Sequence, residues 1–471
     1  PLLVVSDLET GPGMRLTPGG TIFPPAMAFG AAGSTELARE AGRITGIEAR
    51  AVGIHMTLGP LLDLNSNPDN PIINVRSFGE DPRAVGALAS AWIEGARESD
   101  LLAAGKHFPG HGDTRVDSHV GLPTLTLDSA RLDSVELVPF ARVVRDGIAG
   151  MLVGHIAVPA LDGPDAPPAS VSPRLIGAVL REALGFEGLV ITDALNMGGV
   201  TRRYSVAEAS ILALLAGADL LLQPPGTESV IDELVLAVES GRLPAARVNE
   251  AVRRVLATKA RAGLHRNALV STDSVRLRVG TPAHAAAAAR VAQASITLAR
   301  DRNDLVPLSG AARAGPVLHL TYARGGRSAS TLSGALRAAG VPLQDIRLTA
   351  EMTPREMASL RERARNAALV MVSLDAAPVQ YRELGIPAAV TSFVEEISAA
   401  GYPVIAISLG TPYLLRAFPS APTYLLGWSS SASSQRAVAR ALLGTAPIGG
   451  RLPVTLPGLH RRGEAIRRGT R

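Results

Sequence analysis

Residues 106–119 gather side chains that can form charged hydrogen bonds and move protons: Lys-His-Phe-Pro-Gly-His-Gly-Asp-Thr-Arg-Val-Asp-Ser-His. The apolar run before them, 101–105, is typical of a buried parallel strand, which places Lys106 at that strand's carboxyl end. Enzymes built on α/β barrels keep their chemistry at this end. Pro and Gly exclude a regular helix here and give the backbone freedom. We therefore expect a catalytic loop that can swing Asp117 and His119 over a ligand.

A second candidate for chemistry is Asp193, which follows the apolar run 188–192. A carboxylate at a strand's carboxyl end is held rigidly, as nucleophilic attack requires. An Asp that caps a helix near 194–197 would explain the same position. Asp117 and His119 also have two interpretations. They form either a solvated turn or a proton-transfer pair, because imidazole titrates at about 6.5 and a neighbouring carboxylate can orient it.

Motifs along the whole chain resemble those of family 3 glycoside hydrolases, specifically the β-N-acetylglucosaminidase branch. Members of that branch carry Lys-His-Phe-Pro-Gly-His-Gly followed by Asp-Ser-His, and both halves are present here. The other matching motifs are Asn-Pro-Asp-Asn-Pro at 67–71, Arg-Ser-Phe-Gly-Glu-Asp-Pro at 76–82, Gly-His-Ile at 154–156, Ile-Thr-Asp-Ala-Leu-Asn-Met at 191–197 and Gly-Arg-Leu-Pro-Val at 450–454.

The resemblance implies a role for each matching residue. Asp193 would be the nucleophile that forms a glycosyl-enzyme intermediate. His119 would act as acid and then as base, oriented by Asp117. The residues that correspond to the family's contacts with sugar hydroxyls are Lys106, His107, Asp7, Arg15 and Arg76.

The activity implied by the resemblance is that of a retaining, cofactor-independent β-N-acetylhexosaminidase. Its substrate would be a small carbohydrate with terminal β-linked GlcNAc, either a muropeptide from peptidoglycan or a chitin fragment. Two alternatives lie within the family: a GlcNAc phosphorylase, and a β-glucosidase whose acid/base is a Glu of the second domain, with Glu383, Glu395 and Glu396 available. A third alternative is a protein that binds sugar without catalysis.

A metal-dependent hydrolase is a further alternative, since His107, His111, Asp113 and His119 are all metal-ligand types. The spacing disfavours it. His107 and His111 flank a Pro-Gly pair and so cannot share a helical face, and the chain contains no His-Glu-x-x-His motif. We expect no metal.

Composition limits the classes of partner. The chain has 471 residues, of which 46% are apolar and 19% charged, enough for two or three domains with sizeable cores. The net charge is +5, but Lys and Arg residues are spread along the sequence except in the pairs Arg461-Arg462 and Arg467-Arg468, which disfavours nucleic-acid binding. Aromatic residues make up 3%, so a site for one or two sugar units fits better than a long stacking groove. No apolar run is long enough for a membrane span, and the absence of Cys leaves the localisation open.

Strand and helix patterns alternate through the first half of the chain. Strands are expected at 2–6, 54–58, 101–105, 150–154, 189–192 and 219–222. Helices are expected at 34–50, 82–98, 128–145, 172–184, 205–215, 227–240 and 244–262. Such β/α units predict a parallel barrel or a doubly wound sheet, and the family resemblance implies a (β/α)₈ TIM-type barrel over 1–265. The family resemblance places its first two strands upstream of Pro1, so we expect either a fragment or a barrel that is open or closed differently.

A second domain is expected at 291–471, after a connector at 266–290. Its strands fit 317–320, 369–373, 404–408 and 423–426, and its helices fit 329–339, 353–366, 388–400 and 433–443. This order predicts a three-layer α/β sandwich. Gly325-Gly326 lacks the Lys of a phosphate-binding loop, so we expect a packing domain without a nucleotide site.

Overall fold

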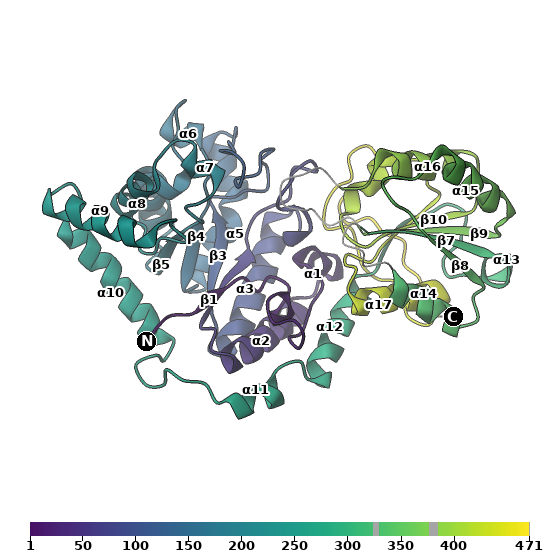
Figure 1. Cartoon of the computed structure of the whole chain (residues 1–471), viewed down its shortest axis with the longest axis horizontal. Helices are drawn as coiled ribbons and strands as arrows, with labels where there is room; N and C mark the ends of the chain where they lie inside the picture. The colour runs from purple at the N-terminus through teal and green to yellow at the C-terminus, as the bar shows by residue number, and fades with distance from the viewer. Residues whose placement is uncertain (324–328, 376–384, 471) are drawn as a thin grey trace. The chain divides into compact units, whose positions relative to one another are not determined.

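The computed structural model describes residues 1–323, 329–375 and 385–470, and the chain forms two compact units (Figure 1). The first unit comprises Pro1–Thr21, Thr35–Ile73 and Glu80–His284. The second comprises Ile22–Ser34, Asn74–Gly79 and Ala285–Arg471. Two short segments from the first half of the chain therefore pack in the second unit, and they interrupt the region that the sequence assigned to the barrel.

The first unit is built on a parallel sheet in the order β1-β2-β3-β4-β5. Its strands are β1 (Val5–Ser6), β2 (Met56–Leu61), β3 (Leu102–Phe108), β4 (Gly150–Val153) and β5 (Leu189–Thr192). Beyond β5, Leu220 forms a single parallel bridge with Ile191, where a sixth strand was expected. The strands β2 to β5 are fully buried, as expected when helices cover a parallel sheet. The TIM-like architecture is confirmed.

Helices α2 (Thr35–Ala51) and α3 (Pro82–Glu98) pack against each other beside the sheet. The side chain of Asp81 caps α3 by accepting a hydrogen bond from Ala84 N, and Pro82 occupies the first turn. The two helices approach closely at Gly42, where an added Cβ would lie 2.0 Å from the carbonyl oxygen of Trp92. Only a residue without a side chain fits there.

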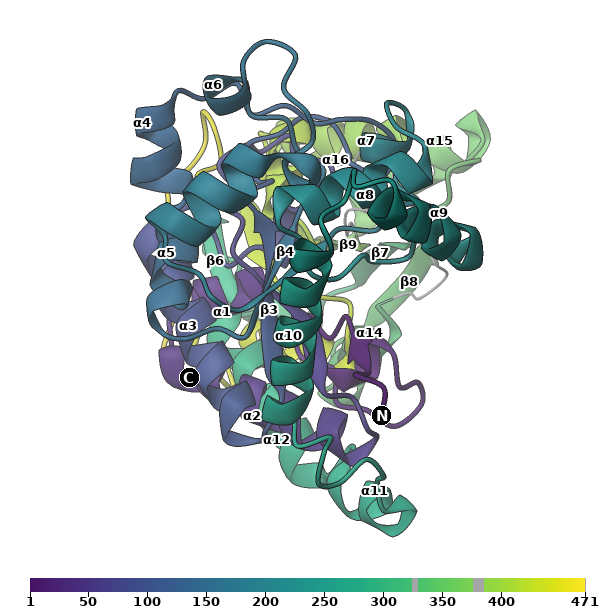
Figure 2. The same ribbon diagram turned by 90° about the vertical axis from the view of Figure 1, so that its left-hand side faces the viewer.

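Other helices of the first unit follow the expected order. Helices α8 (Val206–Ala216), α9 (Thr227–Glu239) and α10 (Ala245–Arg261) pack together beyond β5 (Figure 1 and Figure 2). The remaining elements are η1 (Pro12–Met14), α4 (Ser129–Arg131), η3 (Leu132–Glu136), α5 (Val138–Arg145), α6 (Pro159–Asp162), η4 (Ala169–Val171), η5 (Arg174–Ala183), α7 (Gly198–Thr201) and α11 (Thr272–Arg278). Helix α11 and most of α12 (Pro282–Ser295) lie where the sequence suggested a connector.

The second unit contains a six-stranded sheet in the order β6-β11-β10-β9-β7-β8. Its strands are β6 (Thr297–Asp301), β7 (Val317–Ala323), β8 (Leu343–Arg347), β9 (Leu369–Asp375), β10 (Val404–Ser408) and β11 (Thr423–Leu426). All pairs are parallel except β6 with β11. The sequence did not predict β6 or β8. Both lie at the edges of the sheet, where a strand is paired on one side only.

Helices cover both faces of this sheet, which confirms the three-layer sandwich. One apolar layer contains Leu360 of α15 (Pro354–Asn366) and Phe393 of α16 (Ala388–Ala399). The other contains Leu336 of α14 (Ser330–Ala338) and Val438 of α17 (Ala432–Leu443). The other helical elements of this unit are α1 (Ala26–Ala32), η2 (Asn74–Arg76), α13 (Gly310–Ala314) and η6 (Pro412–Ala417). Within the described part of the chain, every helix is too short or too polar to cross a membrane.

Candidate active site

Asp193 lies immediately after β5, as the sequence predicted. Its backbone N–H donates to the carbonyl of Val153 at 2.8 Å, and its Oδ1 accepts from the N–H of Ala194 at 2.9 Å. Burial alone would raise the pKa of Asp193, but nearby His107, the N–H of Ala194 and the Lys106 cation outweigh it and lower the pKa below its usual value. The carboxylate is therefore ionised at neutral pH, as a nucleophile must be.

His155 braces the loop that carries Asp193. Its Nε2–H donates to the carbonyl of Ala194 at 3.0 Å, and its Nδ1 lies 2.7 Å from the hydroxyl of Ser170. The ring is fully buried, and this burial lowers its pKa. A neutral His155 thus acts as a fixed support for the peptide that follows Asp193.

Asp117 and His119 form a hydrogen-bonded pair. Asp117 Oδ1 accepts from His119 Nδ1 at 2.7 Å and from the backbone N–H of His119 at 2.9 Å. The carboxylate is buried, while a quarter of the His119 side chain is exposed. Because Asp117 holds the proton on Nδ1, Nε2 is the basic nitrogen of the neutral ring, and Asp117 also stabilises the imidazolium. This geometry suits a group that donates a proton and later accepts one.

The loop of this pair is bound to the loop that follows Asp193. Gly198 N–H donates to the carbonyl of His119 at 3.0 Å, and Gly199 N–H donates to the carbonyl of Ser118 at 2.9 Å. A Cβ at Gly198 would lie 2.5 Å from the carbonyl oxygen of Val120, so a side chain there would separate the two loops. The structure thus brings together two segments that lie far apart in the sequence.

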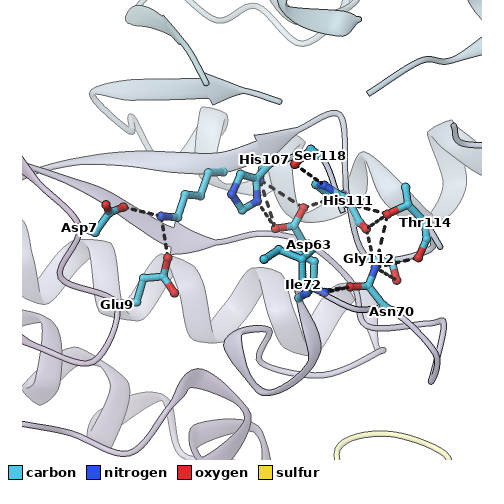
Figure 3. Close-up of polar contacts among 12 residues, drawn as sticks. Asp7, Glu9, Asp63, Asn70, Ile72, His107, His111, Gly112, Thr114 and Ser118 are labelled. Carbon is cyan, nitrogen blue, oxygen red and sulfur yellow. Dashed lines mark hydrogen bonds and ion pairs between the residues drawn. The ribbon is translucent and has the colours of Figure 1, made fainter. Parts of the chain in front are cut away.

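Lys106 forms the centre of a charged cluster. Its Nζ lies 2.8 Å from Asp7 Oδ1 and 2.6 Å from Glu9 Oε1, and the lysine side chain is almost completely buried. Asp7 also binds Arg15 at 3.0 Å. Burial raises the pKa of Asp7, but Lys106 lowers it by more. Of these four residues, only Glu9 was missed by the sequence analysis; like Asp7, it contacts the Lys106 ammonium group (Figure 3).

Asp63 is a second residue that the sequence analysis missed. Its side chain is completely buried and accepts from His107 Nδ1 at 2.8 Å and from His111 N at 2.7 Å (Figure 3). The backbone N–H of His107 donates to it as well, at 3.2 Å. Asp63 therefore fixes the position of two histidines at the end of β3. Its place just after the apolar strand β2 was the available signal.

His111 supports the loop from inside. Its Nδ1 lies 2.6 Å from Thr114 Oγ1 and its Nε2 lies 2.9 Å from Ser118 Oγ. Burial is the main cause that lowers its pKa to about 4, so the ring is neutral at pH 7. Asn70 Nδ2 donates to three carbonyls of the same loop, including that of His111 at 2.8 Å (Figure 3). His111 is thus a structural support.

Among residues 1–323, 329–375 and 385–470, no group of three or more His, Cys, Asp or Glu is arranged to hold a metal ion. The histidines that suggested a metal site have other contacts. His107 is bound by Asp63, and His111 is bound by Thr114 and Ser118.

Arg76 and the alternative acid/base residues belong to the second unit. Arg76 ends η2, and its contact with sugar stays a prediction. Glu395 accepts from the N–H and hydroxyl of Ser420, and Glu396 pairs with Arg361. Glu383, like the Gly325-Gly326 pair, lies outside the described residues.

Substitution of Asp63 should impair the candidate site without changing Asp193 itself. We expect Asp63→Ala to lower kcat/KM by about 10²-fold, the usual effect of losing a group that orients a functional side chain. Steady-state kinetics on the substrate proposed below measure this, with Asp133→Ala as control because Asp133 is an exposed carboxylate. A folded Asp63→Ala protein with activity within twofold of the wild type would show that Asp63 does not position the site.

Glu136, which lies beneath the loop 106–119, should make the stability of the fold depend on pH. Its side chain is fully buried, neither carboxyl oxygen has a hydrogen-bond partner among the described residues, and Arg131 lies 3.6 Å away. Burial, together with the negative potential of Asp113, raises the pKa of Glu136 to about 7. Because the pKa of Glu136 is higher in the folded protein than in the unfolded chain, this group contributes its full stabilisation below the unfolded pKa of 4.5. The contribution is lost as the pH rises towards the folded pKa of about 7.

Glu136→Gln should remove this dependence. The free energy of unfolding of the wild type should fall by up to about 3 kcal/mol between pH 4 and 8 because of Glu136. The variant should not show this fall. Urea unfolding at both pH values measures the difference. If wild type and variant differ by the same amount at both pH values, Glu136 does not titrate in this range.

Comparison with known proteins identifies the family of both domains. Residues 1–258 match the N-terminal domain of glycosyl hydrolase family 3, and residues 283–464 match its C-terminal domain. Beta-hexosaminidase A of Pseudoalteromonas piscicida is 32% identical over 343 residues, covering 68% of this chain and 56% of that protein. Beta-hexosaminidase LpqI of Mycobacterium tuberculosis is 37% identical over 270 residues, covering 55% of this chain and 68% of that protein. The chain thus spans little more than half of the first relative's length.

Solved structures show the same similarity along nearly the whole chain. A family 3 beta-N-acetylglucosaminidase from Paenibacillus sp. str. FPU-7 is 33% identical, with a TM-score of 0.86 over 97% of this chain and 86% of that one. Beta-glucoside phosphorylase BglX is 27% identical, with a TM-score of 0.88 over 98% of this chain and 85% of that one. With both domains matched in order, the chain belongs to glycoside hydrolase family 3.

Proposed function

We propose that this protein is a retaining exo-β-N-acetylglucosaminidase that removes terminal β-linked GlcNAc from peptidoglycan fragments. The observation that supports this most strongly is the His119–Asp117 pair, bound through Gly198 and Gly199 to the loop of Asp193. The relatives named beta-hexosaminidase and the Paenibacillus beta-N-acetylglucosaminidase support the choice of sugar.

In the first step, Asp193 attacks the anomeric carbon and the bond to the leaving oxygen breaks. His119, protonated on both nitrogens, donates the Nε2 proton to that oxygen, and Asp117 stabilises the imidazolium until the transfer. In the second step, neutral His119 takes a proton from water, whose oxygen attacks the same carbon and releases Asp193. Two displacements at one carbon retain the β configuration.

Charged groups around Lys106 supply contacts for the sugar. Lys106, His107 and Asp7 lie at or near the carboxyl ends of β3 and β1, and charged hydrogen bonds to hydroxyls fix a ring's orientation. Arg15, bound to Asp7, would extend this set. The Lys106 cluster thus positions the substrate, and Asp193 and His119 carry out the reaction.

Turnover of aryl N-acetylglucosaminide and aryl glucoside tests the sugar specificity. We expect kcat/KM to favour the N-acetylglucosaminide by about 10²-fold or more, with the β-anomer as first product by NMR. Product profiling with muropeptides and chitin oligomers then identifies the source of GlcNAc. A preference for glucoside would instead favour the β-glucosidase alternative, and an α-anomer would exclude a retaining mechanism.

Phosphate transfer is a second candidate function, favoured by the similarity to a beta-glucoside phosphorylase. A neutral histidine lacks the negative charge with which a carboxylate base would repel phosphate. In high phosphate, we expect GlcNAc 1-phosphate to form in competition with hydrolysis, as measured by phosphorus NMR. Normal hydrolysis without any sugar phosphate would rule this activity out.

A further inference from the structure

The two units carry opposite net charges. The first has 24 Lys and Arg against 31 Asp and Glu, which gives −7, and the second has 23 against 11, which gives +12. Every one of those 23 cations is an arginine. The net charge of +5 for the whole chain therefore conceals a strongly basic second unit. Binding of other molecules to this unit should depend on their charge.

One helical layer of the second unit carries four of these 23 arginines and no acidic residue. Helices α12, α14 and α17 contain no Asp or Glu, although Arg290, Arg337, Arg436 and Arg440 lie on them. We call this helical layer the basic face. In Figure 1, α14 and α17 lie side by side on one side of the sheet, with α15 and α16 on the other. Helices α15 and α16 together carry four Arg and four Glu, so that layer is neutral.

The charges of the basic face are directed to solvent. Arg436 and Arg440 are both exposed and lie one turn apart on α17. The guanidinium of Arg440 donates to the side chain of Gln293 at 2.9 Å. Gln293 is neutral, so this contact does not neutralise the positive charge of Arg440. Arg337 pairs with Asp345 of β8. The α17 arginines therefore give the face a positive potential.

The aromatic and apolar side chains of the second unit exclude some classes of binding partner for the basic face. Each aromatic side chain described between residues 285 and 470 is buried or half-buried, so no ring is available for stacking on bases. The same residues contribute none of the large exposed apolar side chains, so insertion into a lipid surface has no support. Guanidinium groups bind phosphate with two parallel hydrogen bonds. We propose that the basic face docks a linear polymer whose charges are phosphates and that carries neither bases nor lipid.

Binding of fluorescent long-chain inorganic polyphosphate to the full-length chain tests this proposal. The double variant Arg436→Glu with Arg440→Glu should bind about tenfold more weakly or worse, and its affinity should depend less steeply on salt. The matched control is Arg363→Glu with Arg365→Glu on α15, which changes the net charge equally on the opposite face. The control should bind within about twofold of the wild type.

Equal weakening by both double variants would overturn the proposal, because net charge alone would then explain binding. Tighter binding of RNA, of anionic phospholipid vesicles or of polyglutamate than of polyphosphate would also overturn it, since each represents another partner class. Melting temperatures and turnover of an aryl N-acetylglucosaminide establish that both variants are folded. The binding measurement itself does not require catalysis, so it remains decisive if the proposed activity is wrong.

Discussion

Replacement of Asp193 by Ala should lower kcat by about 10⁴-fold or more on every glycoside, whatever its leaving group. In the proposed mechanism the substitution removes the atom that attacks the anomeric carbon, so a better leaving group cannot compensate. Comparison of a nitrophenyl glycoside with a disaccharide measures this. Azide should restore part of the activity of Asp193→Ala, and the product should be the α-glycosyl azide, because a single displacement inverts the configuration.

An Asp193→Ala protein that loses activity only on poor leaving groups would contradict the assignment. Asp133→Ala is a suitable control, since that carboxylate is exposed on the first unit. It should retain full activity on both substrates.

Replacement of His119 by Ala should produce a different pattern. General acid catalysis contributes about 10² to 10⁴ in rate, and this loss should fall mainly on the disaccharide, because a nitrophenolate departs almost unaided. The second step still needs a base. A nitrophenyl glycoside should therefore show a burst followed by a slow steady state, which azide should accelerate with formation of the β-glycosyl azide.

Asp117→Ala should give a milder form of this result, because His119 remains but loses the carboxylate that orients it. His265→Ala is the control, since His265 is exposed on the first unit. Equal slowing of aryl and disaccharide substrates in His119→Ala, with no burst and no azide effect, would contradict the acid/base role. Glu395 and Glu396 would then need to be tested.

Apolar runs and their flanking Pro, Gly and capping residues were sufficient to predict most of the fold. The expected helix 82–98 is α3 without a shift, and Asp81 and Pro82 explain its start. Edge strand β8 was missed because only Leu343 and Ile346 are even half-buried, which leaves no clear alternation. The segments 22–34 and 74–79 join the second unit through packing with residues hundreds of positions away. No local sequence pattern predicts such long-range contacts.

The candidate site was predictable only where a motif was present. Asp193 follows β5, and Asp117 binds His119, as the motifs implied. Asp63 was missed because its function depends on His107, which lies 44 positions further along the chain. Glu136 was missed for a related reason: an acidic residue in a helical pattern is normally exposed, and only the folded structure reveals that it is buried.

The covalent intermediate offers the most direct test of the account. In His119→Ala, rapid formation and slow hydrolysis should make the glycosyl-enzyme accumulate on a nitrophenyl N-acetylglucosaminide. Mass spectrometry of the quenched protein should show one added N-acetylhexosaminyl group, and peptide mapping should place it on Asp193. A label on any other residue, or burst kinetics without a covalent adduct, would contradict the proposed mechanism.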